Sequence, residues 1–280
     1  MKHRNIIALF ILGTVLATVA SAYQLFDMTD FSTGFFKQHL TKEGSLVTAF
    51  SAVVIACIGL VCSQSRRKPR ANEKPSVIFV GISAAYAVIC IADVFLNGFV
   101  ATLNPPISTV VIVICIISAV AVLLISIVGR EFVGLLAAAP LAYSLIRLVL
   151  PFTRFARMPS TAQNMYELAF LCFQLLFWLY SAMLFNKVKT RRATTFLLPI
   201  SLMAACLCFM LAVPQIIAKI ALPEAVHNGT VSPLFLIAFA VYSVYFVLDL
   251  FSIKRMLPNV KKDTEEDQNG TNEFYMGDKK

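Results

Sequence analysis

The fold is decided by an unbroken apolar stretch, 108-STVVIVICIISAVAVLLISIV-128, which contains no charged residue. As an α-helix this stretch can cross the ~30 Å hydrocarbon core of a bilayer, which takes about 20 residues. Similar apolar runs recur along the 280-residue chain. A transmembrane β-barrel is disfavoured, because barrel strands alternate in segments of about ten residues. The sequence therefore predicts an all-α fold, a polytopic transmembrane helix bundle.

The composition of the whole chain agrees with this prediction. Hydrophobic residues make up 59% of the chain and charged residues 14%, whereas a soluble globular domain has about 25% charged residues. The mean hydropathy is +0.79. Because so few charges cannot cover a water-soluble surface, we expect a membrane-embedded chain whose main partner is the lipid bilayer.

Eight spans are expected from the apolar runs, which together form a transmembrane helical domain of residues 1–258. The polar segment 259–280, which mixes both charges, is typical of a disordered cytoplasmic tail. The predicted spans cover residues 5–25, 46–63, 77–97, 108–128, 132–150, 165–186, 194–214 and 232–252.

Lys and Arg residues are concentrated in alternate connections, above all in loops 64–76 and 187–193. By the positive-inside rule these loops face the cytoplasm, which places both termini there as well. The basic residues that give the net charge of +9 are therefore explained by the orientation of the chain in the membrane. No nucleic-acid partner is predicted, because the basic loops lack interleaved aromatic residues.

The first segment has a second interpretation. MKHRNIIALFILGTVLATVASAYQ (1–24) combines a basic start, an apolar core and Ala20-Ser21-Ala22, which resembles a signal-peptidase site. Cleavage would leave seven spans and an external N-terminus. The apolar stretch 6–22 is long for a signal core, which favours a retained helix. Both alternatives stay open.

Charged residues inside the predicted spans are few: Asp93, Arg147, Glu167 and Asp249. The predicted topology places the first three in one layer near the outer membrane face, and Asp249 near the inner face. A charge in hydrocarbon is costly, so such residues face the bundle interior, pair with one another or mark a ligand site.

Polar residues extend these positions along the same helix faces. Tyr86, Asp93 and Asn97 share one face of their span, and Gln174 shares a face with Glu167. These faces could line an outward-facing polar cavity in which Arg147 holds an anionic group and Glu167 or Asp93 is its counter-ion. The candidate ligand-binding residues are therefore Arg147, Glu167, Asp93, Gln174, Tyr86 and Asn97.

Further expectations concern helix ends and breaks. Pro140 lies near the middle of the predicted span 132–150 and would kink it. Pro214 would end the span before it, with a separate surface helix around Ile216–Leu222. Segment 26–45, with aromatic residues at helical spacing, would form a short interfacial helix or a loop.

The seven cysteines all lie in apolar runs, and none lies in an external loop. They do not form the disulfide framework of a secreted domain, and we interpret them as small hydrophobic residues buried in the bundle. The three histidines fall outside the spans, and no GxSxG, Walker A or GxGxxG motif is present. No catalytic constellation and no cofactor are therefore predicted.

Residues 140–186 resemble a segment of multi-pass membrane proteins of clostridial-type bacteria that have no assigned activity. The matching elements are Pro140, Ile146-Arg147-Leu148, the basic aromatic stretch 152–155, and Tyr166-Glu167. The resemblance implies a bacterial cell-membrane location and no mechanism.

Two hypotheses for function arise from the intramembrane charges. The first is transporter-like or sensor-like binding of a small ligand or ion in the outer polar cavity. The second is a structural or assembly protein whose charges only fix helix packing. The sequence does not predict an oligomeric state.

Overall fold

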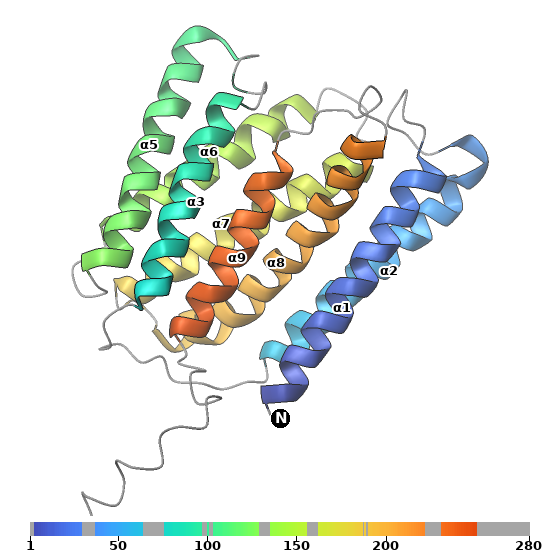
Figure 1. Cartoon of the computed structure of the whole chain (residues 1–280), viewed down its shortest axis with the longest axis horizontal. Coiled ribbons are helices and arrows are strands. Elements are labelled where there is room, and N and C mark those ends of the chain that lie inside the picture. Colours follow the sequence, from blue (N-terminus) through green and yellow to red (C-terminus); the bar gives the residue numbers. More distant parts are fainter. Residues whose placement is uncertain are drawn as a thin grey trace, which may run out of the picture.

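The computed structural model describes residues 3–29, 37–63, 76–96, 100, 103–128, 135–155, 162–186, 188, 190–221 and 231–250. In these ranges every element of regular structure is a helix (Figure 1). A π-helical turn, Gln24–Met28, extends the first α-helix, and a 3-10 turn, Gln38–Leu40, precedes the second. The α-helices are α1 His3–Tyr23, α2 Thr41–Ser63, α3 Val77–Leu96, α5 Pro105–Val128, α6 Ala138–Phe155, α7 Ala162–Phe185, α8 Thr190–Ala221 and α9 Pro233–Leu250.

The prediction of an apolar helix bundle is confirmed. In the described part of the chain, seven helices are long and apolar enough to cross a membrane, and α6 has a shorter apolar part, Ala138–Thr153. The chain is therefore a membrane-embedded helical protein. The count of eight spans and the side on which the termini lie remain predictions, and segment 259–280 lies outside the described residues.

Helix α6 begins at Ala138, later than the predicted start at residue 132. Pro140 therefore lies in the first turn, where its missing N–H has no helical partner to lose, and the expected mid-span kink is wrong. The proline inside α6 is Pro151. Pro151 cannot donate the helical hydrogen bond to the carbonyl of Arg147, four residues earlier.

Helix α8 corrects a second expectation. It runs without interruption from Thr190 to Ala221, with Pro199 and Pro214 inside it. Residues 216–221 continue this helix, so the separate surface helix is wrong. In the expected interfacial segment 26–45, residues 30–36 lie outside the described part. Two short turns flank them, and residues 41–45 form the start of α2.

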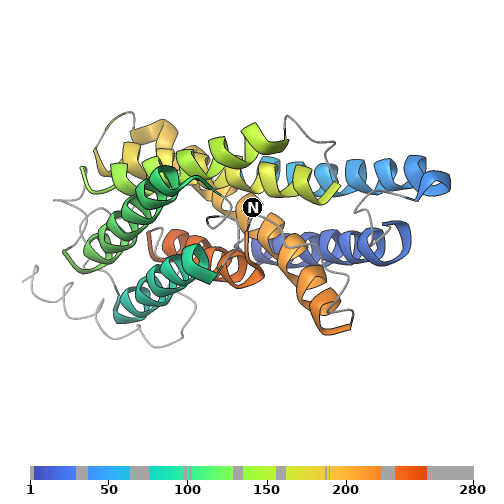
Figure 2. The same cartoon turned by 90° about the horizontal axis from the view of Figure 1, so that it is seen from above.

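Six of the described helices pack in a closed ring. Helix α3 packs against α5 and α9, α6 packs against α5 and α7, and α8 packs against α7 and α9. Helices α1 and α2 form a hairpin that packs on α8 at one side of this ring, while α5 lies at the opposite side (Figures 1 and 2). Helix α8 thus joins the hairpin to the ring.

The interior of the ring is filled by aromatic rings. Four residues of α9 recur every three or four positions and so share one face. Close contacts include Tyr86 with Tyr242, whose ring centroids are 4.8 Å apart, and Phe177 with Phe239, 5.5 Å apart. We call this set the aromatic column; it consists of Phe235, Phe239, Tyr242 and Phe246 of α9, Phe79 and Tyr86 of α3, and Phe170, Phe177 and Trp178 of α7.

Truncating the centre of the aromatic column should destabilise the bundle. Phe239 is fully buried and contacts Tyr86, Phe170 and Phe177. Phe239→Ala is expected to lower the free energy of unfolding in detergent by about 3 kcal/mol, because it leaves a cavity. Phe50→Ala, at a half-exposed position on α2, is the control and should change it little. Equal effects of the two changes would contradict the proposed packing.

Candidate functional site

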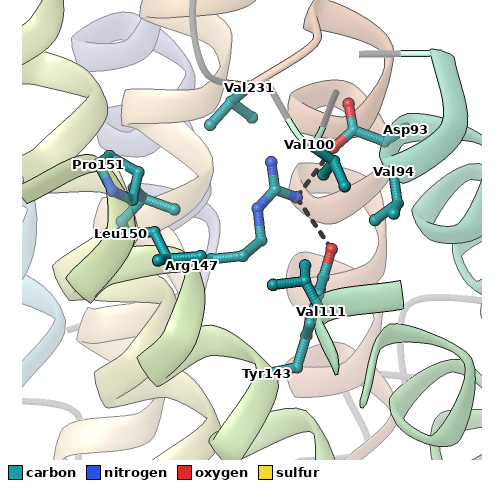
Figure 3. A pocket seen from close by; sticks show the side chains of 10 residues that line it. Asp93, Val94, Val100, Val111, Tyr143, Arg147, Leu150, Pro151 and Val231 are labelled. Carbon is teal, nitrogen blue, oxygen red and sulfur yellow. Dashed lines mark hydrogen bonds and ion pairs between the residues drawn. The ribbon is translucent and has the colours of Figure 1, made fainter. Parts of the chain in front are cut away.

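Arg147 and Asp93 form a buried ion pair at the end of the bundle where α9 begins (Figure 3). Arg147 Nη1 lies 2.9 Å from Asp93 Oδ2, and the two side chains are 10% and 2% exposed. The pair therefore joins α6 to α3 in a place that water hardly reaches.

Local helix geometry aims both side chains inward. On α3, Tyr86, Cys90 and Asp93 follow one another at spacings of four and three residues, and all are buried. On α6, Tyr143 precedes Arg147 by one turn and is buried as well. Asp93 and Arg147 therefore lie on the same faces as these buried residues, and these are the faces that α3 and α6 turn toward the inside of the ring.

The second carboxylate oxygen of Asp93 reaches the start of α9. The backbone N–H of Ser232 donates a hydrogen bond to Asp93 Oδ1 at 3.2 Å. Ser232 Oγ in turn accepts a hydrogen bond from the N–H of Phe235, and Pro233 occupies the first helical position. A carboxylate near a helix N-terminus is favoured by the helix dipole. Asp93 therefore contacts both α6 and the N-terminal end of α9.

The guanidinium of Arg147 also lies against aromatic rings. Its central carbon is 4.4 Å from the ring centroid of Phe235 and 5.8 Å from that of Tyr143. Both distances are within the range of a cation–π contact. Arg147 Nη1 donates to the Tyr143 hydroxyl at 3.5 Å, a long and weak hydrogen bond. Through Phe235 the ion pair rests on one end of the aromatic column.

A small cavity of about 20 Å³ lies beside the ion pair. Asp93, Tyr143 and Arg147 supply its polar atoms (Figure 3). This volume holds about one water molecule. The remaining walls are apolar and come from five helices or their ends: Val94, Val100, Val111, Leu150, Pro151, Leu171 and Val231.

The structure brings some of the predicted site residues together. Of the two proposed counter-ions, Asp93 is the one placed at 2.9 Å from Arg147. Tyr86 lies two turns from Asp93 on α3, in the aromatic column, where its ring contacts Phe235. Asn97 lies outside the described residues. Whether these residues bind a ligand stays a prediction.

The two predicted residues of α7 do not line this cavity. Glu167 is fully buried and is not among the residues that line the cavity. Gln174 is fully buried two turns further along α7, and neither of its amide atoms has a hydrogen-bond partner within the described part. Both residues face the protein interior, as the shared-face argument predicts.

Sequence reasoning missed two contacts of Arg147. Tyr143 lies four residues earlier on the same helix, so the helical spacing could have identified it. Phe235 comes from α9, and no local signal connects it to α6. The cap formed by Ser232 before Pro233 also has a recognisable sequence signature.

A second polar network ties the hairpin to α7. Gln24 Nε2 donates to the carbonyl of Gly44 at 3.2 Å and to Thr48 Oγ1 at 2.9 Å. The hydroxyl of Tyr166 donates to Gln24 Oε1 at 2.9 Å. Because both the nitrogen and the oxygen of the Gln24 side-chain amide have partners, this network is best explained as a structural contact that holds α1, α2 and α7 together.

Comparison with known proteins assigns no relative to this chain: no family model, no curated protein and no solved structure matches it. A functional assignment therefore rests on the geometry of the site.

A double-mutant cycle measures the energy of the ion pair. Arg147→Gln removes the cation from the buried Asp93 carboxylate, and Asp93→Asn removes the anion from the guanidinium. Each single change is expected to lower the free energy of unfolding by about 3–5 kcal/mol. The double variant should lose less than the sum of the two, because it retains no uncompensated charge.

Thermal unfolding of the four purified proteins in detergent gives these differences. Glu43→Gln, at an exposed position in the first turn of α2, is the control and should leave the unfolding midpoint close to that of wild type. Strictly additive single effects would show that the two charges do not stabilise each other.

Proposed function

We propose that this membrane-embedded bundle binds a small anionic ligand or ion at Arg147, as a transporter-like or sensor-like protein. The observation that carries the proposal is the buried ion pair between Arg147 and Asp93, whose carboxylate also contacts the start of α9. The chain would reside in a bacterial plasma membrane, a location that the resemblance of residues 140–186 implies.

The free-energy cost of burying the ion pair supports a role that depends on its charges. Moving two ions out of water costs several kcal/mol per ion, and apolar residues of similar volume often hold helices at least as well. Ionisable residues inside a membrane protein accordingly mark functional sites as a default. A guanidinium offers a planar fork of donors, which suits carboxylate or phosphate groups.

The geometry also supplies a way for binding to change the conformation. An anion that takes the place of Asp93 at the guanidinium would release the carboxylate from α6. The same carboxylate accepts the hydrogen bond from Ser232, so its movement would alter the N-terminal end of α9. Occupancy at Arg147 would thus be coupled to the contact between α3, α6 and α9.

A second candidate is favoured by the size of the cavity. About 20 Å³ accommodates one water molecule, not an organic anion. If the bundle never opens further, the ion pair only fixes the packing of three helices, as expected for a structural or assembly protein. The two candidates differ in whether an anion competes with Asp93.

Competition with Asp93 can be tested directly. Thermal unfolding of the purified full chain is measured with chloride, acetate or phosphate. On the first proposal at least one anion raises the unfolding midpoint of wild type. The rise is larger for Asp93→Asn, which has no competing carboxylate, and absent for Arg147→Gln. Glu43→Gln, which keeps both Arg147 and Asp93, should respond like wild type. The absence of any Arg147-dependent rise would favour the structural candidate.

The topology can be tested with reporter fusions. We expect a reporter that is active only in the cytoplasm to work after residues 70, 190 and 258, because these positions follow basic segments. A reporter active only outside should work after residues 104 and 158. Outside activity after residue 70 or 190 would overturn the proposed orientation, and with it the placement of Arg147 near the outer face.

A further inference from the structure

Cys90 of α3 and Cys115 of α5 lie with their sulfur atoms in contact. The two Sγ atoms are 3.7 Å apart, and Cys115 Sγ is also 3.5 Å from the carbonyl oxygen of Cys90. The side chains are 2% and 1% exposed. The contact bridges two adjacent helices of the ring.

The geometry is one from which a disulfide can form. A disulfide has an S–S distance of about 2.05 Å, so each sulfur must move by less than about 1 Å, which small side-chain rotations provide. Among the described residues, which include all seven cysteines, no other two cysteine sulfur atoms lie in contact. Cys206 and Cys208 are two residues apart on one helix, so their thiols point to different faces.

The pair lies directly beside the ion pair. Cys90 precedes Asp93 by three residues on α3, and Cys115 follows Val111, a wall of the cavity, by one turn on α5. A covalent link at this point would fix α3 to α5 next to the carboxylate that binds Arg147.

We propose that Cys90 and Cys115 form a reversible dithiol–disulfide couple that transfers electrons to a lipid-soluble quinone. Two S–H bonds break and one S–S bond forms. The two electrons and two protons that are released reduce the quinone to the hydroquinone. The proposal does not depend on anion binding at Arg147.

The position of the pair argues for an uncharged oxidant that dissolves in the bilayer. Both cysteines lie inside helices long and apolar enough to span a membrane. Charged oxidants such as a glutathione-type disulfide do not partition into such surroundings. Val88 of α3 and Ile116 of α5 are exposed apolar side chains, so the outer faces of the two helices that carry these buried cysteines meet lipid.

The first test uses the full-length wild-type protein in detergent, so its result does not depend on the folding of a variant. The protein is fully reduced, freed of reductant, and incubated anaerobically with a short-chain benzoquinone or with buffer. It is then denatured in acid and alkylated, and its mass is measured. The buffer sample should carry seven alkylated thiols, the number of cysteines in the chain. The quinone-treated sample should carry two fewer, with one hydroquinone formed per protein.

Tryptic digestion locates the bond. The fragment 71–130 contains Cys90 and Cys115 and no other cysteine. In the quinone-treated sample this fragment should carry no alkyl group and be two hydrogen atoms lighter than the unalkylated dithiol fragment, and a thiol reductant should add the two hydrogen atoms back. Cys90→Ala should abolish hydroquinone formation, whereas Cys206→Ala, a buried cysteine on α8, should not.

Other results would overturn the proposal. Seven alkylated thiols after treatment with quinone would exclude the couple. A quinone adduct on a single cysteine in place of the internal bond would exclude it too. Hydroquinone formation that persists in Cys90→Ala would assign the reaction to other groups.

Discussion

The contact of one carboxylate with two partners fixes how three helices are placed. Asp93 binds the Arg147 guanidinium of α6 with one oxygen, at 2.9 Å, and the backbone N–H of Ser232 before α9 with the other, at 3.2 Å. Because a buried ion left without its partner costs several kcal/mol, neither α6 nor the start of α9 can slide along α3 at small cost. The register of these helices is therefore set by polar geometry.

That register is also the one in which the aromatic column packs. Phe235 contacts the guanidinium of Arg147 on one side and the ring of Tyr86 on the other, with centroid distances of 4.4 and 5.9 Å. In a bilayer, lipid tails are as apolar as the side chains they would replace, so close packing and polar contacts hold helices together. The ion pair selects one arrangement, and the interlocked rings stabilise that arrangement.

The sequence was sufficient for the helical class, for the positions of most of the apolar helices and for the burial of Asp93, Arg147, Glu167 and Gln174, because apolar length and shared helix faces are local properties. Prediction from the sequence failed for the features that depend on contacts between separate helices. Pro214 lies inside a continuous helix, since packing on both sides of α8 outweighs the lost hydrogen bond. The choice of Asp93 as counter-ion, the contact with Phe235 and the proximity of Cys90 to Cys115 each join separate helices, which no periodicity reveals.

The position of α8 has a consequence for biosynthesis. The hairpin of α1 and α2 is complete at about residue 63, yet its main packing surface ends at Ala221. At about 5–20 residues per second, the hairpin waits roughly 8–30 s in the membrane for its partner. During that time Gly59 of α2, which lies against Met203 of α8 in the finished protein, lacks that cover. The early hairpin is thus the stage at which an insertion chaperone, or a wrong neighbour, has the best opportunity to bind.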